Sequence, residues 1–148
     1  MSLWLSDACI VQLSVSLSQI RTLDLRGLKQ IKDNCIRKIV RKCPHLKTLV
    51  LANCLRITDV ALIEVSTYAP NVKWLDASGC RNISNQAIGA VSKNCRGLEH
   101  LDVSSTGITH LSVIMLANNS NETLQTLKIS FCQDITESSI VKLVRNCR

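Results

Sequence analysis

Hydrophobic and polar positions along the chain follow one pattern that returns every 26 residues. In the segment 46–54, which reads LKTLVLANC, leucine returns with period two in the centre, at 49 and 51, and a cysteine closes the segment. Steps of 26 residues give further copies without a change of register at 20–28, 72–80, 98–106 and 124–132. Because side chains alternate between the two faces of a strand, the centre of each copy predicts a short strand with one buried face.

A second segment after each strand predicts a helix. It reads Ile-Thr-Asp or a variant, and a Thr or Ser at its second place, or an Asp or Asn at its third, suits a helix N-cap. The copies are 5–7, 31–33, 57–59, 83–85, 108–110 and 135–137. Apolar residues then recur at helical spacing, as at Ile36, Ile39, Val40 and Cys43. Each unit therefore predicts a strand, a turn, a helix and a turn.

The fourth unit departs from this register, because Ile108 comes one residue early. The polar run 118–123 restores the register. We expect the least regular helix end there, in an exposed loop.

Repetition at a fixed period is typical of solenoids, and L-x-x-L-x-L-x-x-C is the core pattern of leucine-rich repeats. We therefore expect an α/β leucine-rich-repeat solenoid, curved as a horseshoe and coiled right-handed. Its parallel β-sheet should line the concave face and its α-helices the convex face. We expect residues 1–148 to form a single domain of about five 26-residue repeats with partial repeats at both ends. Polar end caps are visible at neither end, so we expect a part of a longer molecule.

The eight cysteines fall into three columns of the repeat. They follow the strand (Cys54, Cys80, Cys132), end the helix (Cys43, Cys95, Cys147) or lie early in it (Cys9, Cys35). Other copies place Leu28, Thr106 or Ala69 in these columns, which a metal ligand or an obligatory disulfide would not allow. We expect reduced, buried thiols that pack as small hydrophobic side chains, with no metal and no cofactor. Cys54 and Cys80, on neighbouring strands, are close enough for a disulfide, so that alternative stays open.

The cysteine after the strand, followed by Ile-Thr-Asp, resembles the cysteine-containing leucine-rich repeats of F-box proteins. The segments 54–59 and 80–85 carry the likeness, together with the helix ends 41–46 and 93–98. It covers essentially the whole chain and is specific to the repeat subclass. The resemblance implies a substrate-binding region of an SCF-type (cullin–RING) ubiquitin ligase receptor, in ubiquitin-dependent protein degradation. The expected free thiols favour a location inside the cell, in the cytoplasm or also the nucleus.

In that family a separate F-box module contacts the ligase adaptor. We find no segment of this chain that resembles an F-box, so an adaptor would be reached only through a segment absent here. The alternative function is an F-box-independent leucine-rich-repeat scaffold or regulatory protein with no ligase link.

Side chains between the buried strand leucines should point to the concave face, where we expect a protein partner. The three columns are Thr22, Thr48, Trp74, His100 and Thr126; Asp24, Val50, Asp76, Asp102 and Lys128; and Arg26, Ala52, Ser78, Ser104 and Ser130. Trp74 is an anchor candidate because interfaces favour tryptophan, unless a loop or a missing repeat covers it. Asp24, Asp76 and Asp102 form an acidic stripe that a basic partner segment would relieve, or an ordinary solvated face. His100, Lys128, Arg26 and, beside the strand end, Phe131 complete the predicted partner-binding set.

Composition and charge narrow the class of partner. Eighteen basic and 11 acidic residues give a net charge of +7, which would suit nucleic acid. The chain has two Trp, one Tyr and one Phe, and these do not interleave with basic residues, so we expect no nucleic acid. No apolar run is long enough to cross a bilayer, and we expect no membrane contact. The basic cluster of the convex helices (Arg37, Lys38, Arg41, Lys42) predicts a solvated outer face.

Catalysis is the remaining class. His100, Asp102, Ser78 and Ser104 should face one side of the sheet. No nucleophile elbow, Gly-rich phosphate loop or oxyanion hole accompanies them, and an open sheet excludes water poorly. We therefore expect a monomeric binding protein that is not an enzyme.

Overall fold

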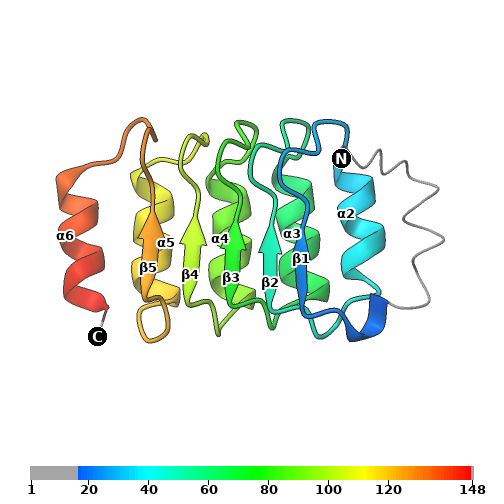
Figure 1. Cartoon of the computed structure of the whole chain (residues 1–148). Coiled ribbons are helices and arrows are strands. Elements are labelled where there is room, and N and C mark those ends of the chain that lie inside the picture. The colour runs from blue at the N-terminus through cyan, green and yellow to red at the C-terminus, as the bar shows by residue number, and fades with distance from the viewer. Residues whose placement is uncertain (1–16, 148) are drawn as a thin grey trace.

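The computed structural model describes residues 17–147, and each repeat within them supplies one strand and one helix (Figure 1). A short 3-10 helix, η2, precedes the first strand at Leu17–Gln19. The strands are β1 Thr22–Asp24, β2 Thr48–Val50, β3 Trp74–Asp76, β4 His100–Asp102 and β5 Thr126–Lys128. The helices are α2 Asp33–Val40, α3 Asp59–Tyr68, α4 Asn85–Asn94, α5 His110–Asn119 and α6 Glu137–Asn146. Cys9 and the segment 5–7, for which the sequence predicts a helix start, lie outside the described residues.

The strands form one parallel sheet in the order of the sequence, β1-β2-β3-β4-β5. The helices form a second layer behind it (Figure 1). The sheet register joins Thr48 to Trp74, Trp74 to His100, and Asp76 to Asp102 as direct neighbours. The predicted columns are therefore confirmed, because a repeat of constant length returns each strand to the same register.

The core lies between the two layers and is continuous along the repeats. Leu49, Leu75 and Leu101 of the central strands have no exposed surface. Their counterparts Leu23 and Leu127, on the edge strands, are only partly buried. The difference follows from the solenoid, in which a repeat covers its leucines against the repeat on either side. In the described part of the chain no helix has the length and apolar character needed to span a bilayer.

Hydroxyl side chains begin four of the helices, as the Ile-Thr-Asp segments predict. The oxygens of Thr58, Ser84 and Thr109 each accept a bond at 3.3 Å from a backbone N–H two residues on. The Thr136 hydroxyl caps α6 by accepting a bond from the Ser139 N–H, three residues on. Lys32 stands at this place before α2 and makes no side-chain cap.

The acidic residue after the cap has another role than the one we expected. Asp33 does not cap its own helix. Its carboxylate accepts bonds from the backbone N–H and the hydroxyl of Thr58 in the next repeat, at 2.8 and 2.7 Å. Asp59 binds Ser84 in the same way, at 2.6 and 2.5 Å, and Asn85 Oδ1 accepts from the Thr109 N–H at 2.9 Å. This ladder of side chains, here called the cap ladder, ties together the starts of α2, α3, α4 and α5.

The cysteines after the strands also connect repeats. The Sγ atoms of Cys54 and Cys80 donate to the carbonyls of Leu25 and Leu51 in the preceding repeat, at 3.1 and 3.2 Å. Burial raises the pKa of Cys80 to about 12, which keeps the proton that this bond needs. Neither thiol forms a disulfide. Each therefore packs in the core and also acts as a weak hydrogen-bond donor, a role that the sequence did not suggest.

The third residue after the end of each strand has a left-handed backbone, with φ between 56° and 74°. The residues of this column are Gly27, Asn53, Gly79, Ser105 and Phe131. Glycine and asparagine adopt such a backbone readily, but a bulky side chain there is strained. Phe131 is therefore an exception within its own column.

The fourth repeat is shortened in the loop between β4 and α5. The polar run 118–123 is less loop-like than predicted, because Asn118 and Asn119 still belong to α5 and Ser120 is only 2% exposed. In the described chain, the Ser120 and Thr123 hydroxyls are buried and lack a hydrogen-bond partner. The turn after α5 is one residue longer than the turn after α4, and this extra residue restores the register. Within residues 17–147 the cost is two buried hydroxyls without hydrogen bonds.

Candidate protein-binding face

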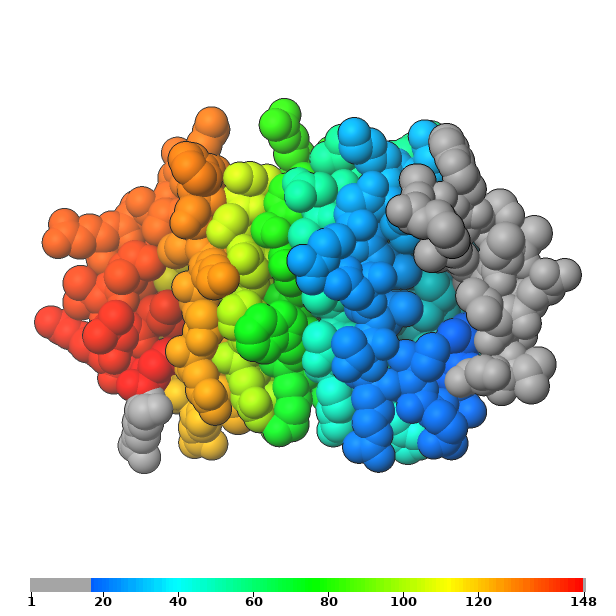
Figure 2. Space-filling model, in the orientation of Figure 1, coloured from blue at the N-terminus to red at the C-terminus, as the bar shows by residue number. Residues whose placement is uncertain are grey.

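The three predicted columns lie on the face of the sheet turned away from the helices, which we call the sheet face. Figure 2 shows this face with the repeats as successive bands of colour. Side chains reach it because the alternate strand residues, the leucines, fill the core on the other side. Its exposed members differ in accessibility, and the differences decide which of them can contact a partner.

Trp74 and His100 form a stacked pair at the centre of the sheet face. They are register neighbours on β3 and β4, and their ring centroids lie 3.6 Å apart with an angle of 10° between the planes. Trp74 remains 46% exposed, whereas His100 is 7% exposed. The expectation that His100 offers an open contact is therefore wrong, because the indole covers its ring. His100 instead supports Trp74 from one side.

The charge of His100 is set by this burial. Burial lowers the pKa of the imidazole, and the cationic Lys128 lowers it further, while Asp102 and Asp76 act in the opposite direction. At neutral pH the ring is therefore uncharged, and the stack with Trp74 is one between two neutral rings.

Asp76 and Asp102 are direct neighbours on β3 and β4. The Oδ1 atom of Asp76 accepts bonds from the backbone N–H and the hydroxyl of Ser78, at 2.9 and 2.7 Å. The Oδ1 atom of Asp102 accepts from the Ser104 N–H at 3.0 Å. Each carboxylate is thus held by its own strand end, as Asp side chains commonly are in turns.

Cations of the chain itself lie near two members of the acidic stripe. Lys128 Nζ is 3.9 Å from Asp102 Oδ2, a loose ion pair. Arg26 binds Asp24 through two nitrogens at 2.7 and 2.9 Å, and this bond holds the pKa of Asp24 below its usual value. The mutual repulsion that we expected is therefore partly relieved within the chain, and Asp24 and Arg26 are engaged with each other.

Phe131 does not belong with these residues. It lies in the loop after β5 and lines a separate groove with Arg81 and Gly107. Both serines on this face bond to other residues, since Ser78 Oγ donates to Asp76 and Ser104 Oγ accepts from the Ser130 N–H. Among residues 17–147 neither serine makes a hydrogen bond to His100.

The helix side of the molecule carries a cluster of cations. The basic cluster on the helices is less solvated than predicted, because Arg37 and Arg41 bind Glu64 of α3 at 2.9 and 3.3 Å and Arg41 lies over the Tyr68 ring. Glu64 and Tyr68 are one helical turn apart, so they share the face of α3 that meets these arginines. Within the described residues no group of His, Cys, Asp and Glu could hold a metal ion.

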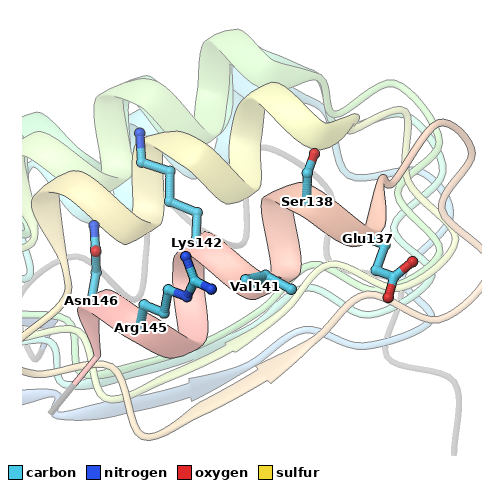
Figure 3. A pocket seen from close by; sticks show the side chains of 6 residues that line it. All are labelled: Glu137, Ser138, Val141, Lys142, Arg145 and Asn146. Atoms are coloured by element: carbon cyan, nitrogen blue, oxygen red, sulfur yellow. The ribbon is translucent and has the colours of Figure 1, made fainter.

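A hollow along the last helix also lacks convergent chemistry. Figure 3 shows its lining, which comes entirely from α6 and spreads along the helix surface. The residues are Glu137, Ser138, Val141, Lys142, Arg145 and Asn146. Because binding sites bring polar groups together from several elements, this hollow is not a candidate.

Comparison with known proteins places the fold. Two segments, 42–66 and 120–144, match the family model described as Leucine Rich repeat. No curated protein sequence matches the chain. Among solved structures, a tropomodulin C-terminal domain from Caenorhabditis elegans covers 95% of this chain and 89% of its own, with a TM-score of 0.69 and 15% identity. Leiomodin-1 actin-binding site 2 covers 99% and 88%, with a TM-score of 0.73 and 14% identity.

A chain from the complex of Rad7 and Elc1 in yeast is similar over 88% of this chain, with a TM-score of 0.69 and 21% identity. This chain spans only 37% of that one. At such identities the likeness shows the fold alone. The predicted α/β leucine-rich-repeat solenoid is confirmed, and such repeats are typical of protein-interaction modules rather than enzymes.

Proposed function

From the premise that a leucine-rich-repeat solenoid is a protein-interaction module, we propose that this chain binds a partner protein on its sheet face. The partner presents a cationic side chain to Trp74, Asp76 and Asp102. One observation carries the proposal. A half-exposed tryptophan, held on one side by His100, adjoins two carboxylates that are already oriented by their own strand ends.

The indole can act on its open side in two ways. The alkyl part of a lysine or arginine packs on the ring, and the charged end gains about 0.5–2 kcal/mol from the ring face. Bonds from that charged end to a carboxylate are about twice as strong as neutral hydrogen bonds. Since Trp74 and Asp76 are held in place before binding, little side-chain entropy is lost on contact.

The net charge of +7 opposes a cationic partner at long range. The attraction is therefore local to the acidic stripe, and it governs orientation and specificity more than the rate of encounter. We expect binding to weaken only modestly with salt, because screening reduces the long-range repulsion as well as the local attraction.

We further propose that the partner is a substrate of an SCF-type ubiquitin ligase, and that this chain is the receptor's repeat region. The repeats with cysteine after the strand support this reading through their resemblance to F-box proteins. The fold likeness to the Rad7 and Elc1 structure is compatible with it. The competing functions are a scaffold with no ligase link and, from the leiomodin likeness, an actin contact.

Affinity purification of the full-length protein from cells tests both parts. The sheet-face variants are Trp74→Thr, which places the residue of Thr48 and Thr126 in that column, and Asp102→Lys. Lys38→Ala, on the helix side, is the matched control. We expect one set of partners to be lost from both sheet-face variants and kept by the control. Partners retained by all variants would refute the sheet-face site, and a complex without cullin adaptor would refute the ligase link alone.

A further inference from the structure

The loops that follow the strands line one edge of the molecule, where the strand arrows end in Figure 1. We call this edge the rim. In the third and fifth repeats the loop from the left-handed residue to the helix-capping segment contains the same number of residues. In the fourth repeat it is one residue shorter, since Gly107 stands where the third repeat has Arg81 and Asn82. The shortened loop leaves a low point in the rim.

A groove of about 470 Å³ occupies this low point. Its lining includes Arg81 from the third repeat, Ser105, Thr106 and Gly107 from the fourth, and Phe131 and Asp134 from the fifth. Because neighbouring strands lie about 4.8 Å apart, the two walls are about 10 Å apart, which is the width of an extended peptide with its side chains. We call it the rim groove.

Gly107 keeps the floor low. A Cβ atom at this place would lie 3.0 Å from the carbonyl oxygen of Ile83, and the Gly107 N–H already donates to that oxygen at 2.8 Å. The loop of the fourth repeat is thereby bound down onto the third repeat. A side chain could not be added there without moving backbone, so the groove is a fixed feature of the shortened repeat.

Phe131 forms the apolar wall of the groove, although both its exposure and its backbone conformation are unfavourable for phenylalanine. Its side chain is 90% exposed, and its φ of 58° is left-handed, where the other repeats have Gly, Asn or Ser. A serine at this place, as at Ser105, would avoid the exposure of an apolar ring and would be less bulky at a left-handed backbone. Strained and exposed residues concentrate at functional sites, and an aromatic ring at such a place is a typical interface anchor.

Charge indicates what would contact this wall. Arg81 is exposed, and within residues 17–147 its side chain makes no hydrogen bond or ion pair. The rim leading to the groove also carries the exposed cations Lys29 and Arg56 on the first two loops. Asp134, on the far wall, is the single carboxylate of the groove lining. The rim is therefore basic over three repeats and apolar at Phe131.

We propose that the rim groove binds an acidic, extended segment of a partner protein, with an apolar side chain against Phe131 and a carboxylate on Arg81. The site is separate from the sheet face and takes a segment of the opposite charge. It needs no contribution from Trp74 or Asp102, so the two proposals can fail independently.

Selection from a phage-displayed library of random 12-residue peptides against the whole chain tests this site. We expect enriched peptides to combine a bulky apolar residue with Asp or Glu a few positions away. Their affinity should fall about tenfold or more on Phe131→Ser and on Arg81→Glu, and stay unchanged on Trp74→Thr. Selection repeated on Arg81→Glu should enrich Lys and Arg instead.

The urea midpoint of Phe131→Ser shows whether weaker binding could come from loss of folding. Phe131→Ser installs the residue that the fourth repeat has at this place, so its urea midpoint should be equal to or above that of the parent chain. The proposal is overturned if no peptide is enriched, if the enriched peptides bind both variants as tightly as the parent, or if Trp74→Thr abolishes their binding.

Discussion

The cap ladder makes a quantitative prediction at Asp59. Replacement by alanine removes both bonds from Ser84, whose N–H and hydroxyl reach the carboxylate at 2.6 and 2.5 Å. Bonds to a charged group contribute about 1.5–3 kcal/mol each when buried, and Asp59 is only partly buried, so we take the lower end. Asp59→Ala should therefore lower the free energy of unfolding by about 2–3 kcal/mol.

Asparagine provides the matched control, because the chain already uses it one repeat further on. Asn85 Oδ1 accepts from the Thr109 N–H, and its Nδ2 lies 3.0 Å from the Thr109 hydroxyl. Asp59→Asn keeps the geometry and loses the charge, so it should reduce the free energy of unfolding by about 1 kcal/mol. Helix propensity does not obscure the comparison, since alanine is the better helix former of the two.

Equilibrium unfolding in urea, followed by circular dichroism, measures the difference. With a slope of about 2 kcal/mol per molar urea, Asp59→Ala should shift the midpoint down by about 1–1.5 M and Asp59→Asn by about 0.5 M. A midpoint for Asp59→Ala close to that of the parent chain would refute the cap ladder as a source of stability. Equal shifts for the two variants would show that the charge alone matters.

Three further predictions concern the strained Phe131, the cysteines and His100. Phe131→Gly should raise the free energy of unfolding by about 1 kcal/mol, because glycine adopts the left-handed backbone without strain; a lower urea midpoint would contradict this. Iodoacetamide at pH 8 should label the partly exposed Cys132 and Cys147 well before Cys80 and Cys95, whose pKa burial raises to about 12, and mass spectrometry that finds the reverse order would refute the burial argument. The pKa of His100 is lower in the folded chain, so its imidazole binds a proton more tightly when the chain is unfolded. The contribution of His100 to stability is therefore present above about pH 6.5 and declines as the pH falls below that value. His100→Thr should therefore show a smaller loss of urea midpoint between pH 8 and pH 5 than the parent chain, and parallel losses would argue against it.

The fold was predictable because its rules are periodic. A constant repeat length fixes the register, so the leucine column and the neighbours of Trp74 could be named from the sequence alone. The hydroxyl caps were predictable for the same reason, since Thr58 and Ser84 occupy one place in the repeat. Each of these properties depends on position within a repeat and hardly on the neighbouring side chains.

The properties that were missed depend on contacts between repeats. The bond from Asp33 to Thr58 crosses 25 residues, and no local pattern distinguishes it from a cap of its own helix. His100 was expected to be open because its column faces solvent, but a neighbouring indole covers it. The left-handed column could not be inferred either, because its residues share no common type and Phe131 is untypical of that backbone.

The most direct test of the sheet-face proposal is a double-mutant cycle between this chain and its identified partner. The affinity is measured for the parent pair, for Asp102→Lys, for the partner with its contacting cation changed to glutamate, and for both changes together. We expect each single change to weaken binding about tenfold or more, and the double change to restore most of the loss, because the charge pair is then reversed but intact. Losses that simply add would contradict a direct contact between the acidic stripe and a cationic partner.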